Sequence, residues 1–302
     1  MPLKLTILGS GSAVPNLNRG VSAQYLNFNE RRILIDCGEG TQLQLRKFKI
    51  KFQRLQYIFI SHLHGDHFLG IFGLLSSMNL LGRENKITIF GPEGLEEIVR
   101  HQFRLTSVYL SYEIEFVSIN VNTKELILED NVMKVYAFPL QHRITCHGFL
   151  FEEKEKALRI RKDAIEEYKL SLTEIVQLKK GLDITRGDEI LANAACTLPP
   201  AKPLQFAYCT DTKYESKLPN WIQAADLLYH EATFTEQHVA RAKITGHSTA
   251  KEAATIAKDA KVGQLLLGHF SARFKDTSPI LDEAKATFSN VTCVEDGQEF
   301  VV

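Results

Sequence analysis

The chain has 302 residues, of which 44% are hydrophobic and 24% are charged. This length fits one large domain or two small ones, and the composition is ordinary for a globular protein with a sizeable core. Lys plus Arg and Asp plus Glu both number 36, so the formal net charge is zero. A balanced charge excludes a general attraction to nucleic acid, so any such binding must come from local basic patches.

The five cysteines are scattered and odd in number, and no two of them form a C-x-x-C pair. This pattern argues against a disulfide framework or a structural zinc knuckle, and it favours the reducing cytoplasm. The start of the chain lacks a charged region followed by a long apolar core, so we expect no signal peptide. The longest apolar stretch, residues 68–81, contains polar residues and is too short to span a bilayer. We therefore expect a cytoplasmic protein with no membrane partner.

Strand-like and helix-like segments alternate along the chain. The predicted strands include residues 3–8, 22–28, 32–36, 87–90, 112–117, 126–128 and 132–138. The predicted helices are residues 41–49, residues 69–81, a helix that Pro92 opens at its first turn, and residues 249–259 with Ser248 as the N-cap. This mixed order predicts an α/β protein, although the pattern alone does not separate one mixed layout from another.

Four side chains that can bind metal lie within six residues after the apolar run 57–61. They belong to the string His62-Leu63-His64-Gly65-Asp66-His67. Strand alternation points His62 and His64 to one side, and the turn through Gly65 redirects Asp66 and His67. Burying these groups without partners would be costly, whereas zinc takes imidazole nitrogen and carboxylate oxygen as ligands. The spacing favours a site for two nearby metal ions over a run of surface histidines.

Three further potential ligands each follow a strand-like segment far along the chain. They are His142 after residues 132–138, Asp211 after the apolar run that ends at Cys209, and His269 after residues 265–268. Taken singly, each would more often be an ordinary hydrogen-bonded, turn or cap residue. Their shared position at strand ends favours the interpretation that they are ligands.

The string from His62 to His67 is the signature of the metallo-β-lactamase superfamily, and the distant ligands follow in the order of that superfamily. Further segments resemble ribonuclease Z, the short form of the tRNA 3′-processing endonuclease: residues 8–15, 35–42, 230–234, 246–249 and 268–274. The resemblance covers the chain nearly end to end. It implies a single domain over residues 1–302, folded as an αββα sandwich.

The resemblance also implies a function and a set of site residues. The enzyme would be a zinc-dependent endoribonuclease that removes the 3′ trailer from precursor tRNA, leaving a 3′-hydroxyl on the tRNA, by attack of a zinc-bound hydroxide. Two zinc ions per subunit are implied, one held by His62, His64 and His142 and one by Asp66, His67 and His269, with Asp211 bridging both. Asp66 would orient the attacking water, and Glu231 with His247 would protonate the leaving oxygen. The family is commonly a homodimer, in which the arm of one subunit serves the site of the other.

Residues 152–189 interrupt the alternation, because they are dense in charge and helix formers and offer no metal ligand. They could form a solvated helical pair on the surface. The resemblance implies instead an inserted arm that binds the tRNA body, mainly through phosphates. The expected substrate-binding residues are Lys169, Lys179 and Lys180 in the arm, and Arg19, Ser271 and Arg273 elsewhere.

Two segments depart from the family pattern. Residues 15–20 keep the proline and arginine of the family's P-x-K-x-R-N loop but lack its lysine and final asparagine, which leaves open whether a 3′ CCA end blocks cleavage. Residues 168–181 stand where many members have a Gly/Pro-rich loop. The alternative function is a small-molecule phosphodiesterase or arylsulfatase-like dinuclear zinc hydrolase, which would share the metal ligands. A non-enzymatic RNA-binding protein would be expected to lack ligands, and none is missing.

Overall fold

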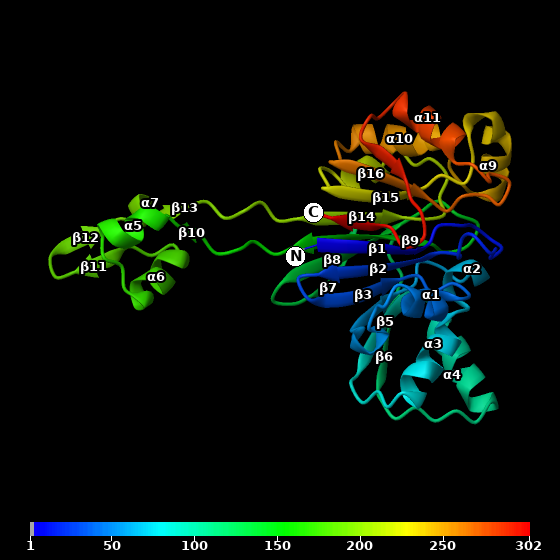
Figure 1. Ribbon diagram of the computed structural model, residues 1–302, viewed down its shortest axis with the longest axis horizontal. Helices are drawn as coiled ribbons and strands as arrows, with labels where there is room; N and C mark the ends of the chain where they lie inside the picture. Colours follow the sequence, from blue (N-terminus) through cyan, green and yellow to red (C-terminus); the bar gives the residue numbers. More distant parts are fainter. Residues whose placement is uncertain (1–2) are drawn as a thin grey trace. The chain divides into compact units, whose positions relative to one another are not determined.

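The computed structural model describes residues 3–302 and divides into two compact units (Figure 1). Unit 1 comprises the chain up to Phe151 and from Leu204 onward, and unit 2 comprises Glu152–Pro203. Unit 1 contains every predicted metal ligand, so the site is built by this unit alone.

Unit 1 contains two seven-stranded sheets. In spatial order, the strands of the first sheet are β18 (Glu299–Val301), β1 (Leu3–Gly9), β2 (Ala23–Phe28), β3 (Arg31–Ile35), β4 (Tyr57–Phe59), β5 (Ile87–Pro92) and β6 (Ile114–Ile119). Those of the second sheet are β17 (Val291–Cys293), β16 (Gln264–Gly268), β15 (Leu227–Glu231), β14 (Gln205–Cys209), β9 (His147–Glu153), β8 (Met133–Pro139) and β7 (Glu125–Glu129).

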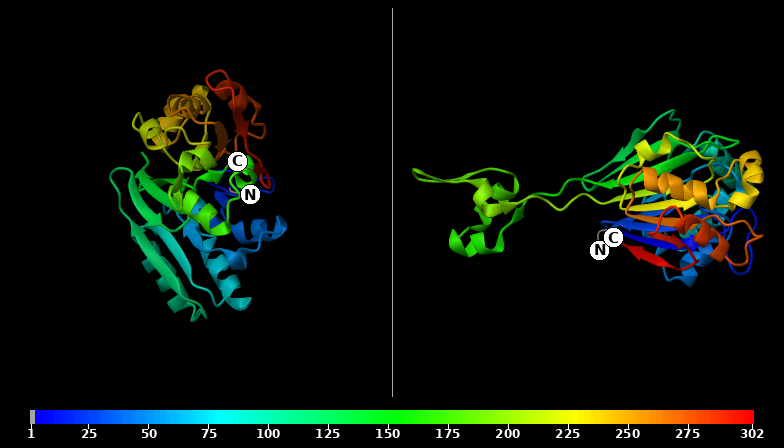
Figure 2. Two further views of the ribbon diagram at one scale, coloured as in Figure 1. Left: turned by 90° about the vertical axis from the view of Figure 1, so that its left-hand side faces the viewer. Right: turned by 90° about the horizontal axis from the view of Figure 1, so that it is seen from above.

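The two sheets pack face to face over an apolar core, and helices cover their outer faces (Figures 1 and 2). Phe59 and Phe90 of the first sheet and Phe149 and Tyr208 of the second belong to the core between the sheets. The helices on the first sheet are α1 (Thr41–Lys47), α3 (Ile71–Leu80) and α4 (Leu95–Leu105). Those on the second sheet are α8 (Leu218–Trp221), α10 (Ala250–Asp259) and α11 (Ser278–Lys285). The predicted αββα sandwich is confirmed.

The sheet order explains how distant residues reach one site. Strands β3 and β4 are parallel neighbours, and so are β14, β15 and β16. The carboxyl ends of parallel neighbours lie at the same edge of a sheet, where open α/β sheets bind their ligands. Residues that follow these strands therefore gather at one edge, although more than two hundred positions in the chain separate some of them.

Unit 2 has a small hydrophobic core of its own. It contains α5 (Lys162–Glu167), α6 (Leu172–Lys179), α7 (Asn193–Cys196) and two antiparallel pairs, β10 (Arg159–Ile160) with β13 (Thr197–Leu198) and β11 (Ile184–Arg186) with β12 (Glu189–Leu191). Its buried apolar residues are Ala164, Leu170, Leu178, Ile184 and Cys196. The predicted helices are present, but the compact unit extends beyond residue 189 to Pro203 and includes short strands that the charge pattern did not indicate.

Two predicted helix starts are wrong. Pro92 ends β5, and α4 begins at Leu95 after Gly94, whose φ of 91° is accessible to glycine. The N-cap of α10 is Thr249, which forms a capping box with Glu252. The Ser248 hydroxyl instead donates to the Thr212 carbonyl. Within residues 3–302, no helix combines the length and apolar character needed to cross a membrane.

Candidate metal centre

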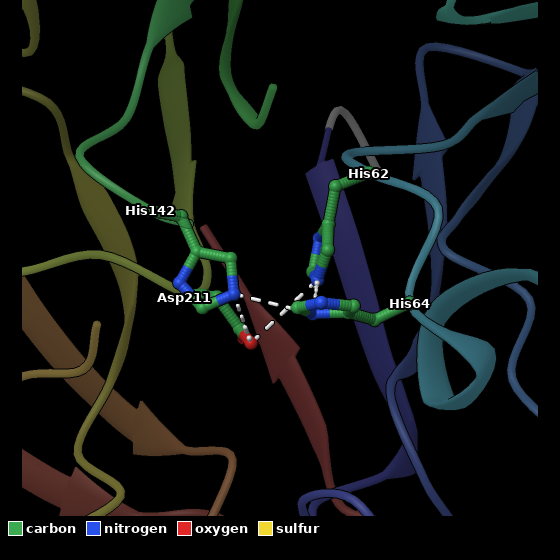
Figure 3. Close-up of side chains that lie close together, drawn as sticks. All are labelled: His62, His64, His142 and Asp211. Carbon is green, nitrogen blue, oxygen red and sulfur yellow. Dashed lines mark hydrogen bonds and ion pairs between the residues drawn. The ribbon is translucent and has the colours of Figure 1, made fainter. Parts of the chain in front are cut away.

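Four side chains form the first group of potential ligands (Figure 3). His62 and His64 follow β4, His142 follows β8 and Asp211 follows β14. The Nδ1 atom of His64 lies 3.0 Å from His62 Nε2 and 3.2 Å from His142 Nε2. Asp211 Oδ2 is 3.6 Å from both of those Nε2 atoms.

The second group lies against the other oxygen of the same aspartate. His67 in α2 (Gly65–Phe68) and His269 after β16 place their Nε2 atoms 3.3 Å apart. Asp66 Oδ2 lies 3.5 Å and 3.4 Å from these nitrogens, and Asp211 Oδ1 lies 3.3 Å and 3.1 Å from them. Each oxygen of Asp211 thus faces one group of three other ligands.

The donor atoms fit metal ions better than they fit one another. A single proton on His64 Nδ1 cannot satisfy two other ring nitrogens at once. Burial keeps the pKa values of His62 and His64 below the usual range, so their lone pairs are available at neutral pH. Zinc ligands at 2.0–2.1 Å in a tetrahedron are separated by about 3.3 Å, close to the spacings in both groups. The residues can therefore hold metal.

The acidic groups around His67 also favour a cation. Burial alone would lower the pKa of His67, but the carboxylates of Asp211, Asp36 and Asp66 outweigh it and raise that pKa well above its usual range. Negative charge that stabilises a proton on the ring equally stabilises a metal ion beside it.

Hydrogen bonds on the far side of the rings orient the ligand histidines. The remote Nδ1 atoms of His62, His142 and His269 lie 3.0, 2.8 and 2.9 Å from Ser61 Oγ, the Gly246 carbonyl and Thr233 Oγ1. Such partners fix the tautomer and the direction of a metal-binding histidine.

Asp36 orients a fourth ring, that of His67. Its side chain is fully buried after β3 and lies 2.7 Å from His67 Nδ1. The same carboxylate accepts hydrogen bonds from the Ser61 amide, the Ser61 hydroxyl and the Tyr208 hydroxyl. The turn that follows is close-packed, because a Cβ at Gly38 would lie 2.3 Å from the Asp66 carbonyl oxygen. Only glycine fits where the segment after β3 meets α2.

Glu231 and His247 form a pair beside the metal ligands. His247 Nδ1 lies 3.0 Å from Glu231 Oε1 and 3.8 Å from Asp211 Oδ2. Burial would lower the pKa of His247, but the two carboxylates outweigh it and raise that pKa to about 9. Glu231 is fully buried and also accepts from the amides of Thr212 and Thr233. The pair can hold a proton at neutral pH.

A cavity of about 320 Å³ opens over these groups. It is lined by Ser12, Ala13, Pro15, Val21, Glu39, His64, Gly65, Asp66, Leu69, Arg143, Asp211, His247 and His269. Arg143 is the one Lys or Arg in this lining, and the described residues give its exposed side chain no ion pair. It is therefore available for an anionic ligand.

The predicted substrate-binding residues of unit 1 are occupied by contacts within the protein. The Arg19 guanidinium lies over the Phe270 ring and donates to the Phe274 carbonyl. Arg273 lies over the Phe234 ring and donates to the Ser271 hydroxyl at 3.2 Å. These contacts order the loops beside the cavity. In unit 2, Lys169, Lys179 and Lys180 are exposed and have no ion pair among the described residues.

The structure adds Asp36, Thr233 and Arg143 to the residues at the site. Asp36 belongs to the segment 35–42 and Thr233 to the segment 230–234, and both segments carry the family resemblance. The resemblance could therefore have identified both residues as part of the site. Arg143 directly follows the predicted ligand His142. A positive charge next to a predicted metal ligand is the sequence feature that could have identified Arg143 as a site residue.

Replacing Asp36 by Asn should weaken metal binding. The amide has the size of the carboxylate but cannot accept all of the hydrogen bonds that now converge on it. We expect the affinity for Zn²⁺ to fall by about 10- to 100-fold, the scale typical for partners that orient metal ligands. Competition with a chromophoric chelator measures this change. Tyr208→Phe removes one donor to the same carboxylate and should have a smaller effect. Wild-type affinity in Asp36→Asn would contradict the orienting role.

Comparison with known proteins places this site in a family. Residues 3–153 match the family model described as Anti-Pycsar protein Apyc1. The structure of the metallo-β-lactamase fold protein YhfI from Bacillus subtilis aligns with 99% of each chain at a TM-score of 0.71 and 21% identity, which agrees with the fold. Human tRNase Z, short form, aligns with 99% of this chain and 98% of its own at a TM-score of 0.71 and 29% identity.

The sequence relatives extend over both units. Ribonuclease Z of Bacteroides fragilis is 44% identical over 288 residues, which cover 95% of each chain. This match spans nearly the whole sequence, whereas the Apyc1 match stops at residue 153. The chain belongs to the ribonuclease Z family.

Proposed function

We propose that this protein is a zinc-dependent endoribonuclease that removes the 3′ trailer from precursor tRNA and leaves a 3′-hydroxyl on the tRNA. The observation that carries the proposal is Asp211, whose two oxygens face two separate groups of ligands. Two zinc ions per subunit would be held there, the first by His62, His64 and His142 and the second by Asp66, His67 and His269. Zinc supplies Lewis acidity, which activates water and stabilises charge on phosphate oxygens during phosphodiester hydrolysis.

Side chains of this protein can donate and accept the protons that the reaction requires. Hydrolysis adds water to phosphorus and breaks the bond to the 3′ oxygen, which must gain a proton. His247 uses Nδ1 for Glu231, and Nε2 has no hydrogen-bond partner among the described residues. Nε2 can therefore donate to the 3′ oxygen, while Glu231 stabilises the charged ring. Asp66 lines the cavity and can orient the attacking water or accept its proton.

The proposal is tested with purified protein, end-labelled precursor tRNA with and without CCA, and elemental analysis. We expect about two zinc ions per chain and cleavage that leaves a 3′-hydroxyl on the tRNA. A protein that hydrolyses a small chromogenic phosphodiester but leaves precursor tRNA intact would instead be the small-molecule hydrolase. One ion or none, in protein never exposed to chelator, would exclude the dinuclear site.

Substitution of His247 or Glu231 should separate proton delivery from metal binding. His247→Ala and Glu231→Gln should retain zinc, because neither residue belongs to the proposed ligand set, and lose about 10²-fold or more in single-turnover rate. His230→Gln is a suitable control: His230 is buried one residue away, and its Nδ1 contacts the Glu231 carbonyl oxygen. A parental rate in either of the first two variants would remove that residue from the relay.

We further propose that unit 2 binds the body of the tRNA. Lys169, Lys179 and Lys180 are the candidates, since they are exposed and free of ion pairs. Arg159 and Arg161 are engaged within the unit, where their guanidinium groups donate to the carbonyls of Pro199 and Ala195. The three lysines can therefore meet phosphates without first losing a partner.

Replacing the three lysines by alanine should weaken tRNA binding and flatten its salt dependence. Each lost phosphate contact on a duplex lowers the slope of log K against log salt by about 0.9. The control is alanine at Lys258, Lys261 and Lys285, which are exposed lysines of unit 1. The two sets are matched, because each includes one lysine with positive φ, Lys169 or Lys261. Equal salt slopes for the two variants would argue against the proposed contacts, and small-diester hydrolysis should be unchanged in both.

We also propose that the protein is a cytoplasmic homodimer. The five thiols are all free, as a reducing compartment would leave them. Large apolar side chains are exposed at Leu43 on α1 and at Leu80 on the neighbouring helix α3, where a second subunit could cover them. Light scattering of the purified protein gives the subunit number, and a monomer at micromolar concentration would contradict the dimer.

A further inference from the structure

The loop that joins β1 to β2 forms one wall of the cavity. Residues 10–20, hereafter the N-terminal loop, contribute Ser12, Ala13 and Pro15 to the lining. The Ala13 amide donates to Asp66 Oδ2 at 2.7 Å, so the loop also contacts a proposed metal ligand. The position of this wall therefore affects both the shape of the cavity and the surroundings of Asp66.

Both ends of the loop are bonded to one carboxylate, that of Asp296. Its Oδ1 accepts from the Ser10 amide at 3.0 Å and the Ser10 hydroxyl at 2.8 Å. Its Oδ2 accepts from the Gly20 amide and from Gln44 Nε2 on α1, both at 2.7 Å. Asp296 lies in the turn between β17 and β18, almost at the other end of the chain.

The arrangement requires a carboxylate at this position. Four donors converge on the two oxygens, and an amide side chain would turn an NH₂ group toward one pair of them. Hydrogen bonds to a charged acceptor are about twice as strong as neutral ones. Glycine at position 20 leaves room for these hydrogen bonds. A Cβ there would lie 3.0 Å from Gln44 Nε2 and 3.4 Å from Asp296 Oδ2.

Backbone hydrogen bonds also hold the ends of the loop: the Gly11 amide donates to the Gly20 carbonyl at 2.9 Å, and the Phe270 amide donates to the Ser10 carbonyl at 2.9 Å. The bonds to Asp296 are added to this backbone framework, and separate contacts hold the tip. Asn16 Oδ1 accepts from the amides of Asn18 and Arg19, which closes a turn at the tip. The contacts of Arg19 with Phe270 and Phe274 join that tip to the loop after β16. Without the bonds to Asp296, the ends would keep only their backbone hydrogen bonds, so residues 11–15, which carry the cavity wall, would be held less firmly.

We infer that Asp296 is a positioning residue for the active site. Together with the backbone hydrogen bonds at the same places, it fixes the two ends of the N-terminal loop, so that the loop forms the cavity wall and delivers the Ala13 amide to Asp66. The effect on catalysis rests on the proposed function, since the wall would border the RNA strand at the scissile phosphate. The effect on the loop itself does not depend on the substrate.

Hydrogen exchange measured by mass spectrometry on the zinc-loaded protein tests the restraint directly. In Asp296→Asn, amides of residues 10–20 should exchange at least about tenfold faster, as expected when a charge-assisted hydrogen bond is lost. Amides of α10 should exchange as in the parent, and zinc content should be unchanged. Glu295→Gln is the matched control, because Glu295 is the adjacent acid and its side chain is exposed. Unchanged exchange in residues 10–20 would overturn the inference.

Kinetics tests the consequence for the reaction. We expect Asp296→Asn to lower kcat/KM for precursor tRNA by about tenfold or more, mainly by raising KM. The change should be smaller for bis(p-nitrophenyl) phosphate, because this substrate is too small to contact the cavity wall along its length. A role limited to stability would lower zinc content and both activities together, and this outcome would contradict positioning. If the parent protein fails to cleave precursor tRNA, the proposed function is wrong. The hydrogen-exchange result would still show whether Asp296 restrains the N-terminal loop.

A second variant covers the case in which Asp296→Asn does not fold. Gly20→Ala leaves the carboxylate in place and crowds the contact from the side of the loop, where its Cβ would also lie 3.2 Å from the Leu8 carbonyl oxygen. It should reproduce the faster exchange of residues 10–20 and the rise in KM. If Gly20→Ala retains both parental exchange and parental KM, the contact between Asp296 and the loop end has no positioning role.

Discussion

The site depends on the burial of the Asp211 carboxylate, whose side chain is only 3% exposed. No lysine or arginine pairs with it among the described residues, and its neighbours within 4 Å include five histidines. A buried carboxylate is strongly unfavourable unless positive charge compensates it, and the His247 ring at 3.8 Å, whose pKa is raised to about 9, is one source of that charge. Metal ions between Asp211 and the surrounding rings would supply further positive charge, so the burial of this one carboxylate favours a metal site around it.

Assembly around Asp211 requires both sheets. The first sheet delivers His62, His64, Asp66 and His67 after β4, and the second delivers His142, Asp211 and His269. Ligand positions therefore depend on how the two sheets pack, and close-packed interiors such as the aromatic core between them allow little freedom. Behind the ligands, the Tyr208 hydroxyl of the second sheet bonds to Asp36 of the first at 2.7 Å. The His147 amide of β9 likewise donates to the Ser61 carbonyl at 3.0 Å. These bonds tie the sheets together next to the site.

A feature is easier to predict from the sequence when the residues that determine it lie close together in the chain. The residues from His62 to His67 are contiguous, so their spacing alone indicated metal. Residues such as Asp211 and His269 are ordinary in isolation, but the ends of predicted strands marked them. The αββα layering came from the family resemblance, because alternation of strands and helices fits several layouts.

Features created by long-range contacts could not be read in the same way. Asp296 is one acid among 36 acidic residues, and nothing near it in the sequence indicates that it meets Ser10. The start of α10 was misplaced by one residue, because Ser248 and Thr249 are both good N-caps and only the capping box with Glu252 decides between them. The short strands of unit 2 carry too few residues for a periodic pattern.

Metal binding would stabilise the fold of unit 1, which contains all of the potential ligands found among the described residues. Ions that bind only the native state stabilise it by about 2.7 kcal/mol when their free concentration is a hundred times Kd. Such a gain would help to offset the cost of burying Asp211 and Glu231, both of which are nearly inaccessible to solvent. Unit 2 supplies no potential ligand among the described residues. Its own apolar core and the capping box of α6 stabilise it. The buried charges that metal would compensate thus lie in unit 1, and the surface of unit 2 can vary without changing the potential ligands.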